Sequence, residues 1–425
     1  RNFTDSDTRI AIIEVGGTVG EIESQPFLES IRQFQHDIGR NNAILLHVTL
    51  IPFLSASQEL KTKPTQASVK ELQSMGLQAD IIVCRSEHPI DQSIRDKIAL
   101  FCNVPSTHVL QNLDVSYIYE APLAMEEERL AQAVCESLHL ECPPPDLSDW
   151  IAMVNDLKTP TGEITIALVG KYVSLHDAYI SVVEALKHGG IPNHVTVSIK
   201  WILSEDVTEQ SEEALFRDVD GILVPGGFGT RGIEGKIRAI HYARTHKIPF
   251  LGLCLGMQLA IVEFARYQLG FTDANSIEFN SATTHPVIAL MPDQNGIENI
   301  GGTLRLGAYP CVLDKDSKAY ALYGEEFIYE RHRHRYEVNN DYREMLTQQG
   351  LCLSGISPDN RIVEMCEVKD HPFFVATQGH PELKSRPNRP HPLFRGLVEA
   401  ALLHKQSHLC QETDSDTIDE MSEQN

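Results

Sequence analysis

One stretch of the sequence, residues 248–266, constrains the fold of this chain more than any other. It reads IPFLGLCLGMQLAIVEFAR, an apolar strand that passes through Gly252, Cys254 and Gly256 into an amphipathic helix. A glycine on either side of Cys254 permits the sharp strand-to-helix turn that displays a nucleophile in many hydrolases. The amino terminus of a helix favours a thiolate over a thiol, so the stretch predicts an exposed, nucleophilic cysteine. Taken alone, it fits a small buried cysteine equally well.

Two other stretches favour the nucleophile. Residues 221–229, GILVPGGFG, end an apolar strand in a glycine-rich loop whose N–H groups, with that of Leu255, would form an oxyanion hole. The sequence FFVATQGHPE leads another strand to His380 and Glu382. Pro381 favours an extended backbone at His380, and residues two apart in an extended chain share a face, so we predict that Glu382 orients the imidazole. Such sites form at the carboxyl ends of parallel strands.

The pattern around these stretches predicts a C-terminal α/β domain. Strands at 163–170, 194–202 and 221–224, with a helix near 178–188, imply a parallel, doubly wound sheet. The sequence GFGTRG at 227–232 also matches the G-x-G-x-x-G fingerprint of dinucleotide sites. That fingerprint needs an acid at the end of the next strand, and the strand ends instead in leucine and cysteine, which argues against a dinucleotide.

The first part of the chain predicts a second α/β region with polar loops. Residues 9–14, RIAIIE, form a short predicted strand that ends at Glu14, next to two glycines, where a carboxylate suits a magnesium ion. The loop KTKPTQ at 61–66 has two cations and several polar groups, which suit a triphosphate. A plain turn at Glu14 and a solvated loop at 61–66 are open alternatives. Further elements are predicted at 26–38, 43–51, 80–84, 93–102 and 122–138.

The domain boundaries follow from composition. The sequence CPPPD at 142–146 breaks regular structure, so we expect a linker over 142–162, with one short helix at 147–157, between domains at 1–141 and 163–405. The segment 406–425 is acidic and poor in apolar residues, which predicts a disordered tail.

Charge and cysteine content exclude several classes of protein. A formal net charge of −23 argues against nucleic-acid binding, which rests on paired phosphate charge. Nine cysteines without a C-x-x-C pair indicate reduced thiols and a cytoplasmic protein. No apolar run is long enough to cross a membrane, and no signal peptide is visible. The chain starts without Met, so we expect it to be a fragment.

Several motifs resemble those of known enzymes. GLCLGMQ, PGGFG and HPE, in this order, resemble the class I glutamine amidotransferase domain, which hydrolyses glutamine to release ammonia. EVGGTVGEIES, KTKPTQ, QNLDVSYIYE and ERHRHRYEVNN resemble the CTP synthase family, which aminates UTP. The resemblance extends from about Arg9 to about Leu403. It implies an α/β fold with an incomplete, P-loop-like synthetase domain followed by a doubly wound amidotransferase domain.

The resemblance also implies roles for individual residues. Cys254, His380 and Glu382 would form the catalytic triad, while Glu278 would bind the amino group of glutamine and Arg335 its carboxylate. The other residues of the glutamine pocket would be Gly227, Leu255, Gly256, Met257 and Gln258. The UTP and CTP pocket would comprise Glu21, Ile22, Glu23, Lys61, Thr62, Lys63, Pro64, Thr65, Gln66 and Lys97.

Glu14 would bind Mg²⁺ and Val115 would lie beside the ATP adenine. The run ERHRHRY at 330–336, which contains Arg335, could instead be a solvated charged loop. Gly379 departs from the family pattern, in which an aromatic residue commonly precedes the histidine of H-P-E. We expect the absence of this aromatic ring to loosen the wall beside the triad and to lower the catalytic rate.

The resemblance implies an ATP-dependent amination of UTP to CTP with ammonia from glutamine. The resemblance adds GTP as an activator, CTP as a feedback inhibitor and a homotetramer. No Gly-Lys phosphate loop precedes Glu14, so the amination half would be incomplete if the chain were complete. Two other functions stay open: an enzyme with the same triad and another acceptor, including a γ-glutamyl peptidase, or a non-catalytic assembly subunit.

Overall fold

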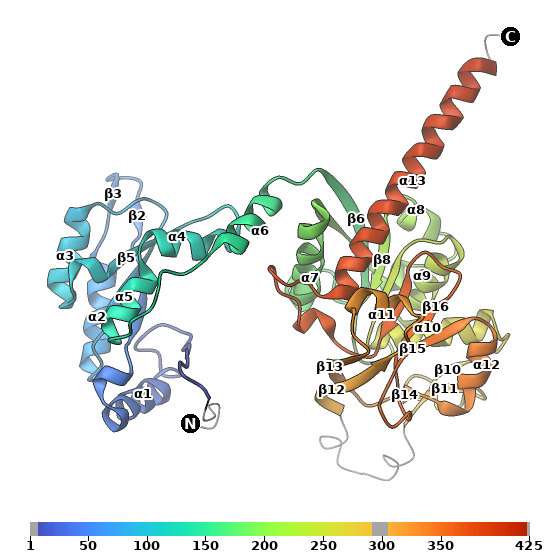
Figure 1. The fold of residues 1–425 in the computed structure, drawn as a ribbon, viewed down its shortest axis with the longest axis horizontal. Helices are drawn as coiled ribbons and strands as arrows, with labels where there is room; N and C mark the ends of the chain where they lie inside the picture. Colours follow the sequence, from blue (N-terminus) through green and yellow to red (C-terminus); the bar gives the residue numbers. More distant parts are fainter. Residues whose placement is uncertain (1–6, 291–304, 423–425) are drawn as a thin grey trace. The chain divides into compact units, whose positions relative to one another are not determined.

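The computed structural model describes residues 7–290 and 305–422, with side chains to residue 408 (Figure 1). The chain divides into two compact units, Arg1–Ile151 and Ala152–Asn425. Among the described residues, no helix is both long enough and apolar enough to cross a membrane.

Unit 1 is built on a three-stranded parallel sheet in the order β1-β4-β5. Side chains alternate across each strand, so Ile82 and Cys84 of β4 face a core with α1, α2 and α3, while Ile81 and Val83 face α4 and α5. Its elements are α1 (Gln25–Ile38), β1 (Leu46–Leu50), β2 (Phe53–Leu54), β3 (Glu59–Leu60), α2 (Lys63–Ser74), β4 (Ile81–Ser86), α3 (Gln92–Cys102), β5 (Val109–Leu113), α4 (Ala121–Glu127) and α5 (Leu130–Ser137).

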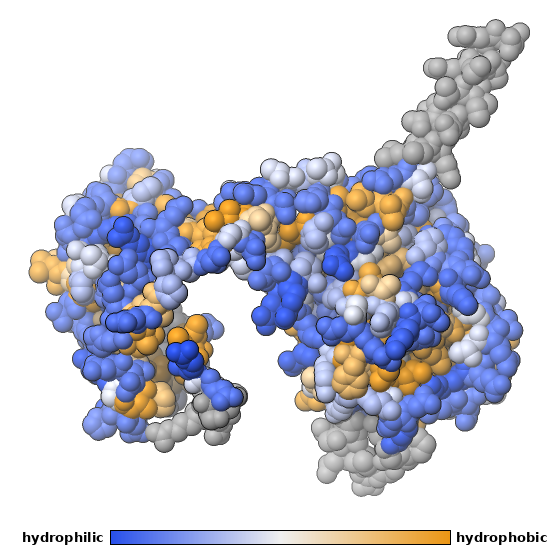
Figure 2. All heavy atoms as spheres, viewed as in Figure 1, coloured by the Kyte–Doolittle hydropathy of each residue, from blue (hydrophilic) through white to orange (hydrophobic). Residues whose placement is uncertain are grey.

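Two predictions for unit 1 are wrong. Residues 9–14 do not form a strand: none of the described strands pairs with them, and Ile12 is 95% exposed. The helix predicted at 122–138 is broken at Arg129, which adopts a left-handed backbone with φ 60° and separates α4 from α5. Hydrophobic residues reach the surface of this unit in patches (Figure 2), and they include one face of β1, where Val48 and Leu50 are exposed.

Unit 2 contains a nine-stranded sheet in the order β13-β12-β15-β16-β17-β9-β8-β6-β7. The half from β17 to β7 is parallel, which confirms the predicted α/β architecture. The half from β13 to β17 is antiparallel and was not expected. Strands β10, β11 and β14 form a separate small sheet that has no strand in common with the nine-stranded sheet.

Helices cover both faces of the parallel half (Figure 1). Helices α9 and α10 pack on the face that carries Ala167 and Val169 of β6, and α7, α11 and α13 pack on the face that carries Ile166 and Leu168. The elements are α6 (Ser148–Lys158), which crosses the boundary between the units, β6 (Gly162–Gly170), α7 (Ile180–Gly190), β7 (Val195–Leu203), α8 (Glu212–Phe216), β8 (Gly221–Val224), α9 (Ile233–Thr245), β9 (Phe250–Leu253), α10 (Leu255–Tyr267), β10 (Asn275–Ser276), β11 (Pro286–Ala289), β12 (Arg305–Leu313), α11 (Lys318–Tyr323), β13 (Phe327–His334), β14 (Glu337–Val338), α12 (Arg343–Gln348), β15 (Leu351–Ile356), β16 (Val363–Val368), β17 (Phe374–Thr377) and α13 (Pro392–Ser422).

The C-terminal segment differs from the predicted disordered tail. Helix α13 is anchored by buried Leu397 and Ala401 and continues to Ser422. No glycine or proline follows Gly396, so nothing in the sequence stops the helix once its first turns are packed. The last three residues of the predicted tail lie outside the described part of the chain.

Candidate active site

Cys254 lies at the sharp turn between β9 and α10, as predicted. It has φ 50° and ψ −99°, a strained backbone for a residue with a side chain. The glycines beside it are required by close packing: a Cβ at Gly252 would lie 2.9 Å from the backbone of Gly256, and a Cβ at Gly256 would lie 2.2 Å from the carbonyl oxygen of Val224. The prediction that Cys254 is exposed is wrong, because its side chain is only 4% exposed.

Strand β13 and the segment after β17 cover the cysteine. The Sγ of Cys254 is 4.0 Å from the carbonyl oxygen of Arg333, and the side-chain amide of Gln378 donates to Sγ at 3.6 Å. Its backbone N–H donates to the carbonyl oxygen of Thr377 at 2.7 Å. The nucleophile is therefore reached through a pocket and not from open solvent.

His380 and Glu382 meet as the motif predicts. The Nδ1 of His380 is 2.8 Å from Oε1 of Glu382, and both side chains are largely buried. The local backbone differs from the extended one expected, because Pro381–Leu383 forms a 3₁₀ turn closed by a hydrogen bond from Leu383 N–H to the His380 carbonyl oxygen. The turn still brings the two side chains together.

Cys254 and His380 face each other across the glycine-rich loop. A Cβ at Gly226 would lie 3.0 Å from Cε1 of His380 and 3.5 Å from Cβ of Cys254. Burial alone would lower the pKa of His380, but the Cys254 thiol and the Glu382 carboxylate outweigh burial and raise it to about 10. The imidazole is therefore held in the protonated form that a leaving amine needs.

A cavity of about 150 Å³ opens in front of Cys254. Of the residues predicted for the glutamine pocket, Gly256 and Met257 do not line it, since both are buried behind the turn. The sequence analysis missed three lining residues, although each lies within a motif it identified. The full lining is Gly227, Phe228, Cys254, Leu255, Gln258, Glu278, His334, Arg335 and Tyr336.

Side chains of opposite charge, Glu278 and Arg335, line this cavity. Burial raises the pKa of Glu278, while the N–H of Gly229, at 3.5 Å from Oε1, and the positive charges of Arg335 and Lys171 act against the shift. Gln258 also lines the cavity, and its amide donates to the Tyr336 carbonyl oxygen at 3.0 Å. A carboxylate and a guanidinium in one small cavity suit the ammonium and carboxylate groups of an amino acid.

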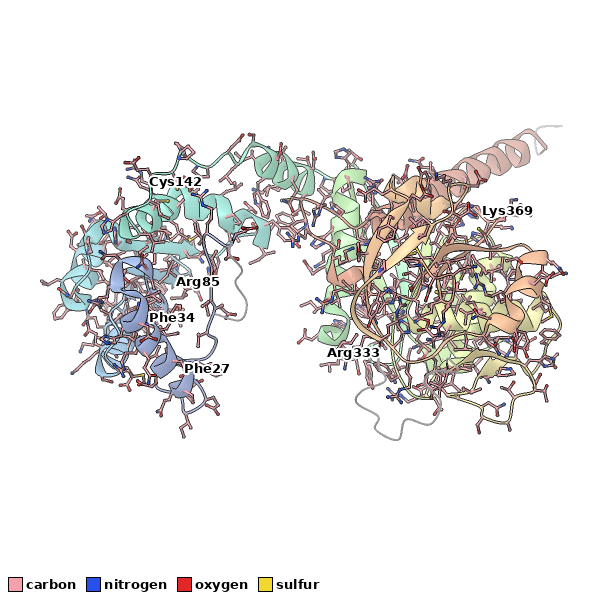
Figure 3. The ribbon with its side chains drawn as sticks, turned by 60° about the horizontal axis from the view of Figure 1, so that its bottom comes forward. Phe27, Phe34, Arg85, Cys142, Arg333 and Lys369 are labelled. Carbon is pink, nitrogen blue, oxygen red and sulfur yellow. The ribbon has the colours of Figure 1, made fainter. Side chains whose placement is uncertain are left out.

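The run at 330–336 is not the solvated loop considered as an alternative. Its first five residues belong to β13, in which Glu330, His332 and His334 are buried while Arg331 and Arg333 are exposed (Figure 3 labels Arg333). The alternation of the sequence is thus the two-residue period of a strand, and that signal was available before the structure.

The buried histidines form a polar network beneath the site. Nδ1 of His332 is 3.0 Å from Nε2 of His334, and the Arg305 guanidinium binds the buried carboxylate of Glu364. Burial is the main cause that lowers the pKa of His332 to about 2 and that of His334 to about 3. Both histidines are therefore neutral in the folded protein at physiological pH.

This network predicts a loss of stability in acid. The pKa of each histidine is depressed from 6.5, so its contribution is fully present above that value and is lost as pH falls below it. The depressed pKa of each histidine should lower the free energy of unfolding by about 2 kcal/mol when the pH falls from 7 to 5. Burial raises the pKa of Glu337, which acts in the opposite direction, so the histidine effect must be measured as a difference between variants.

Urea unfolding of His332→Gln at both pH values tests this expectation. The variant should lose about 2 kcal/mol less than the wild type between pH 7 and pH 5. The control is His246→Gln, since His246 is exposed on the same unit, and its pH dependence should match the wild type. A wild-type slope in the His332→Gln protein would contradict the neutral, buried assignment.

The wall beside the triad is closed at Gly379. A Cβ there would lie 3.1 Å from Cβ of Glu330, 3.3 Å from the Arg331 carbonyl oxygen and 3.4 Å from Oγ1 of Thr377. The expected loosening is absent, because β13 fills the space that a ring would need.

Most of the nucleotide residues predicted in unit 1 occupy surface or partly exposed positions, but Thr62 and Thr65 are buried. KTKPTQ is not a free loop, because α2 begins at Lys63 with Pro64 in its first turn. That signal was readable in the sequence, since proline favours the first turn of a helix. Thr65 is buried, with Oγ1 3.1 Å from Oγ1 of Thr49 on β1. Surface or partly exposed positions are occupied by Glu14, Glu21, Ile22, Glu23, Lys97 and Val115.

A resident metal is not supported by the donor set around Glu14. Within residues 7–290 and 305–422, no group of three or more His, Cys, Asp or Glu could hold a metal ion. Glu14 is a single exposed carboxylate, and hard cations prefer several oxygen ligands. The proposed glutaminase reaction of unit 2 needs no metal ion at Glu14.

The sequence of this chain matches two family models and many known proteins. Residues 1–140 match the family CTP synthase N-terminus, and residues 174–400 match glutamine amidotransferase class-I. The CTP synthase of Clostridium acetobutylicum is 56% identical over 402 residues, which cover 95% of this chain and 75% of that protein. That of Carboxydothermus hydrogenoformans is 58% identical over 398 residues, which cover 94% and 74%.

One solved structure supports the architecture of unit 2. It is the glutaminase domain of Trypanosoma brucei CTPS with bound acivicin, with a TM-score of 0.54 and 39% sequence identity. The match covers 56% of this chain and 94% of that one.

Proposed function

Because this chain belongs to the CTP synthase family, we propose that unit 2 hydrolyses glutamine at Cys254 and that unit 1 uses the ammonia to convert UTP to CTP. One observation carries the proposal for unit 2: three loops far apart in the sequence meet at Gly226, where Cys254 faces a His380 that is hydrogen-bonded to Glu382. The match of residues 1–140 to the CTP synthase N-terminus favours UTP over another acceptor.

The first half of the glutaminase reaction forms a thioester. The Cys254 thiolate attacks the side-chain amide carbon of glutamine, and the carbonyl π electrons move to oxygen. The N–H groups of Leu255 and the Gly227 loop stabilise the oxyanion. When the oxyanion collapses, the C–N bond breaks and His380 gives its proton to the nitrogen, which leaves as ammonia.

The second half returns the enzyme to its starting state. The now neutral His380 accepts a proton from water as the hydroxide attacks the thioester carbon. The C–S bond breaks, glutamate leaves and the thiolate is restored beside the imidazolium. Glu382 fixes the ring through Nδ1 in both halves, so Nε2 faces the reacting atoms each time.

Glutamine is recognised by its two charged groups. Glu278 binds the α-ammonium and Arg335 the α-carboxylate, which leaves the amide directed at Cys254. The proposal is supported by the lining of the cavity, in which all three residues take part.

Replacing Glu278 by Gln should weaken glutamine binding more than it slows chemistry. Loss of the charge opposite the ammonium is expected to raise KM for glutamine about 10-fold to 100-fold, equivalent to about 1.4 to 3 kcal/mol, with a smaller change in kcat. Steady-state kinetics provide the check. The matched control is Glu234→Gln, a carboxylate 70% exposed on α9, which should keep the wild-type KM. Equal KM values in the two variants would refute the role of Glu278.

In unit 1, the start of α2 is proposed to bind the UTP phosphates. The N–H groups of its first turn and the cations Lys61 and Lys63 favour a phosphate there. ATP would phosphorylate the 4-oxygen of UTP, and ammonia would displace that phosphate to give CTP, ADP and inorganic phosphate. The other proposed nucleotide residues are Glu21, Ile22, Glu23, Thr62, Pro64, Thr65, Gln66, Lys97 and Val115.

Further properties are proposed from family membership alone. Mg²⁺ would accompany the ATP phosphates, GTP would activate glutamine hydrolysis, CTP would inhibit by competing with UTP, and the enzyme would assemble as a homotetramer. A cytoplasmic location is supported by the free thiols of the eight cysteines whose side chains the structure describes.

Product analysis tests the coupled reaction. With glutamine, UTP, ATP and Mg²⁺, the protein should form CTP and glutamate, and omission of UTP should stop CTP formation. Ammonium chloride should replace glutamine as the nitrogen source. Glutamate release at the same rate with and without nucleotides, with no CTP in either mixture, would favour the separate glutaminase.

A further inference from the structure

We propose that Glu330 is a positioning residue for the glutaminase reaction: from strand β13 its buried carboxylate holds the turn that carries His380 and Glu382. This inference rests on the proposed function of the triad. It concerns a residue that touches neither glutamine nor Cys254, and it explains how a base on a short surface turn is fixed against a separate strand.

The carboxylate of Glu330 binds two residues that follow the catalytic turn and one residue of helix α11. Its Oε1 is 3.1 Å from Nζ of Lys384, which follows the turn, and 3.0 Å from Nε2 of His391, which precedes α13. The hydroxyl of Tyr323, on α11, donates to the same oxygen at 3.1 Å. Glu330 is only 1% exposed, so these donors are its environment in place of water.

The backbone of β13 holds the other end of the same turn. The N–H of His380 donates to the carbonyl oxygen of Arg331 at 2.7 Å. Two successive residues of β13 therefore hold the turn, one through its carbonyl at His380 and one through its side chain at Lys384. Inside the turn, the N–H of Lys384 and that of Ser385 donate to the Pro381 carbonyl oxygen at 3.0 Å and 3.2 Å. A shift of Lys384 would thus be passed to His380.

The close approach at Gly379 makes this attachment rigid. Gly379 lies where β13 meets the turn, and a Cβ there would be 3.1 Å from Cβ of Glu330. A side chain at this position would require Glu330 or the turn to shift by a few tenths of an ångström. The small residue before His380 and the buried glutamate are therefore two parts of one packing arrangement.

The charge state of Glu330 suits this role. Burial would raise the pKa of Glu330, but hydrogen bonds from His391 and the charge of Lys384 outweigh burial and lower it. The carboxylate is therefore ionised through the neutral pH range, and its bonds to these donors are charge-assisted.

The test compares two variants of Glu330 with a matched buried glutamate. Glu330→Gln keeps the size of the side chain and one acceptor oxygen but removes the negative charge that faces Lys384 and His391. Glu330→Ala removes the acceptor as well. The control is Glu367→Gln on β16: Glu367 is 3% exposed and accepts from the N–H groups of Lys318 and Ala319, away from the triad. Active sites are counted with an electrophilic glutamine analogue so that rates refer to folded enzyme.

We expect kcat per active site to fall about 10-fold in Glu330→Gln and about 100-fold in Glu330→Ala, because misplacing a catalytic group by about 1 Å can slow a reaction about 100-fold. KM for glutamine should stay within about 3-fold of wild type. A second readout is the pH dependence of Cys254 alkylation by iodoacetamide without glutamine. Its midpoint should move upward in both Glu330 variants, as the thiolate loses its aligned imidazolium, and not in Glu367→Gln.

Wild-type kcat per active site and an unchanged alkylation midpoint in Glu330→Gln would overturn the inference. Equal losses of kcat in Glu330→Gln and Glu367→Gln would also overturn it, because they would reduce the effect to general destabilisation. A different result would contradict the proposed function, namely a wild-type protein without glutaminase activity.

Discussion

Cys254→Ala should abolish glutamine-dependent CTP formation and leave ammonia-dependent formation intact. The sulfur is the group that makes and breaks the bond to the amide carbon, so the glutaminase rate should fall at least about 10³-fold. The substitution removes only the thiol group and keeps Cβ at the same backbone position, so it adds no volume and unit 2 should fold normally.

The measurement is glutamate release and CTP formation with either nitrogen source. Cys352→Ala provides the control, because this half-buried thiol on β15 lies outside the cavity and its loss should leave both activities unchanged. Glutamate release by the Cys254→Ala protein within about 10-fold of wild type would contradict nucleophilic catalysis by this residue. Loss of activity with both nitrogen sources would contradict the separation of glutaminase and amination between the units.

Gly256→Ala should strongly destabilise unit 2. Its Cβ would lie 2.2 Å from the Val224 carbonyl oxygen and 3.4 Å from Cβ of Val224, so α10 would have to move away from β8. Backbone atoms cannot move aside as a flexible side chain does, and overpacking of this kind costs about 3 kcal/mol or more. Because the turn at Cys254 depends on the same contact, glutaminase activity should fall with stability.

Chemical denaturation of unit 2 tests this expectation. The control is Gly162→Ala, since a Cβ at Gly162 would meet only a Val195 methyl carbon, at 3.8 Å. That variant should remain within about 0.5 kcal/mol of wild type. A similarly small effect in Gly256→Ala would show that the strand and the helix are not packed as closely as described.

The parts of the site that follow from local rules were readable in the sequence. The turn at Cys254 depends on residues within two positions of it, and the meeting of His380 and Glu382 depends on three consecutive residues. The α/β architecture followed from alternating strands and helices. The roles of the individual residues stay predictions until the variants are measured.

The parts that depend on distant pairing were missed or wrong. Cys254 is buried because β13, about 80 residues away in sequence, lies across it, and no local pattern indicates that contact. Residues 9–14 have the composition of a strand but find no partner among the described strands, and pairing decides whether such a segment is ordered in a sheet. The acidic tail has a low tendency to be buried, yet a packed helix before it extends into it.

The run at 330–336 is an intermediate case. Its alternation of charge matched a strand as well as it matched a solvated loop, and the charges favoured the loop because buried charges are rare. Glu330 and His332 are buried because they find partners in other strands and helices. Two of those partners, His391 and Glu364, are more than thirty residues away in the sequence, so composition alone could not reveal them.

Rapid acid quench with radiolabelled glutamine, followed by mass spectrometry of the digested protein, tests the central claim most directly. A thioester mechanism at the converging loops predicts one glutamyl group on the peptide that contains Cys254, formed and lost at the rate of turnover and absent from Cys254→Ala. Label on a different residue, or turnover at the wild-type rate with no covalent glutamyl enzyme, would contradict it.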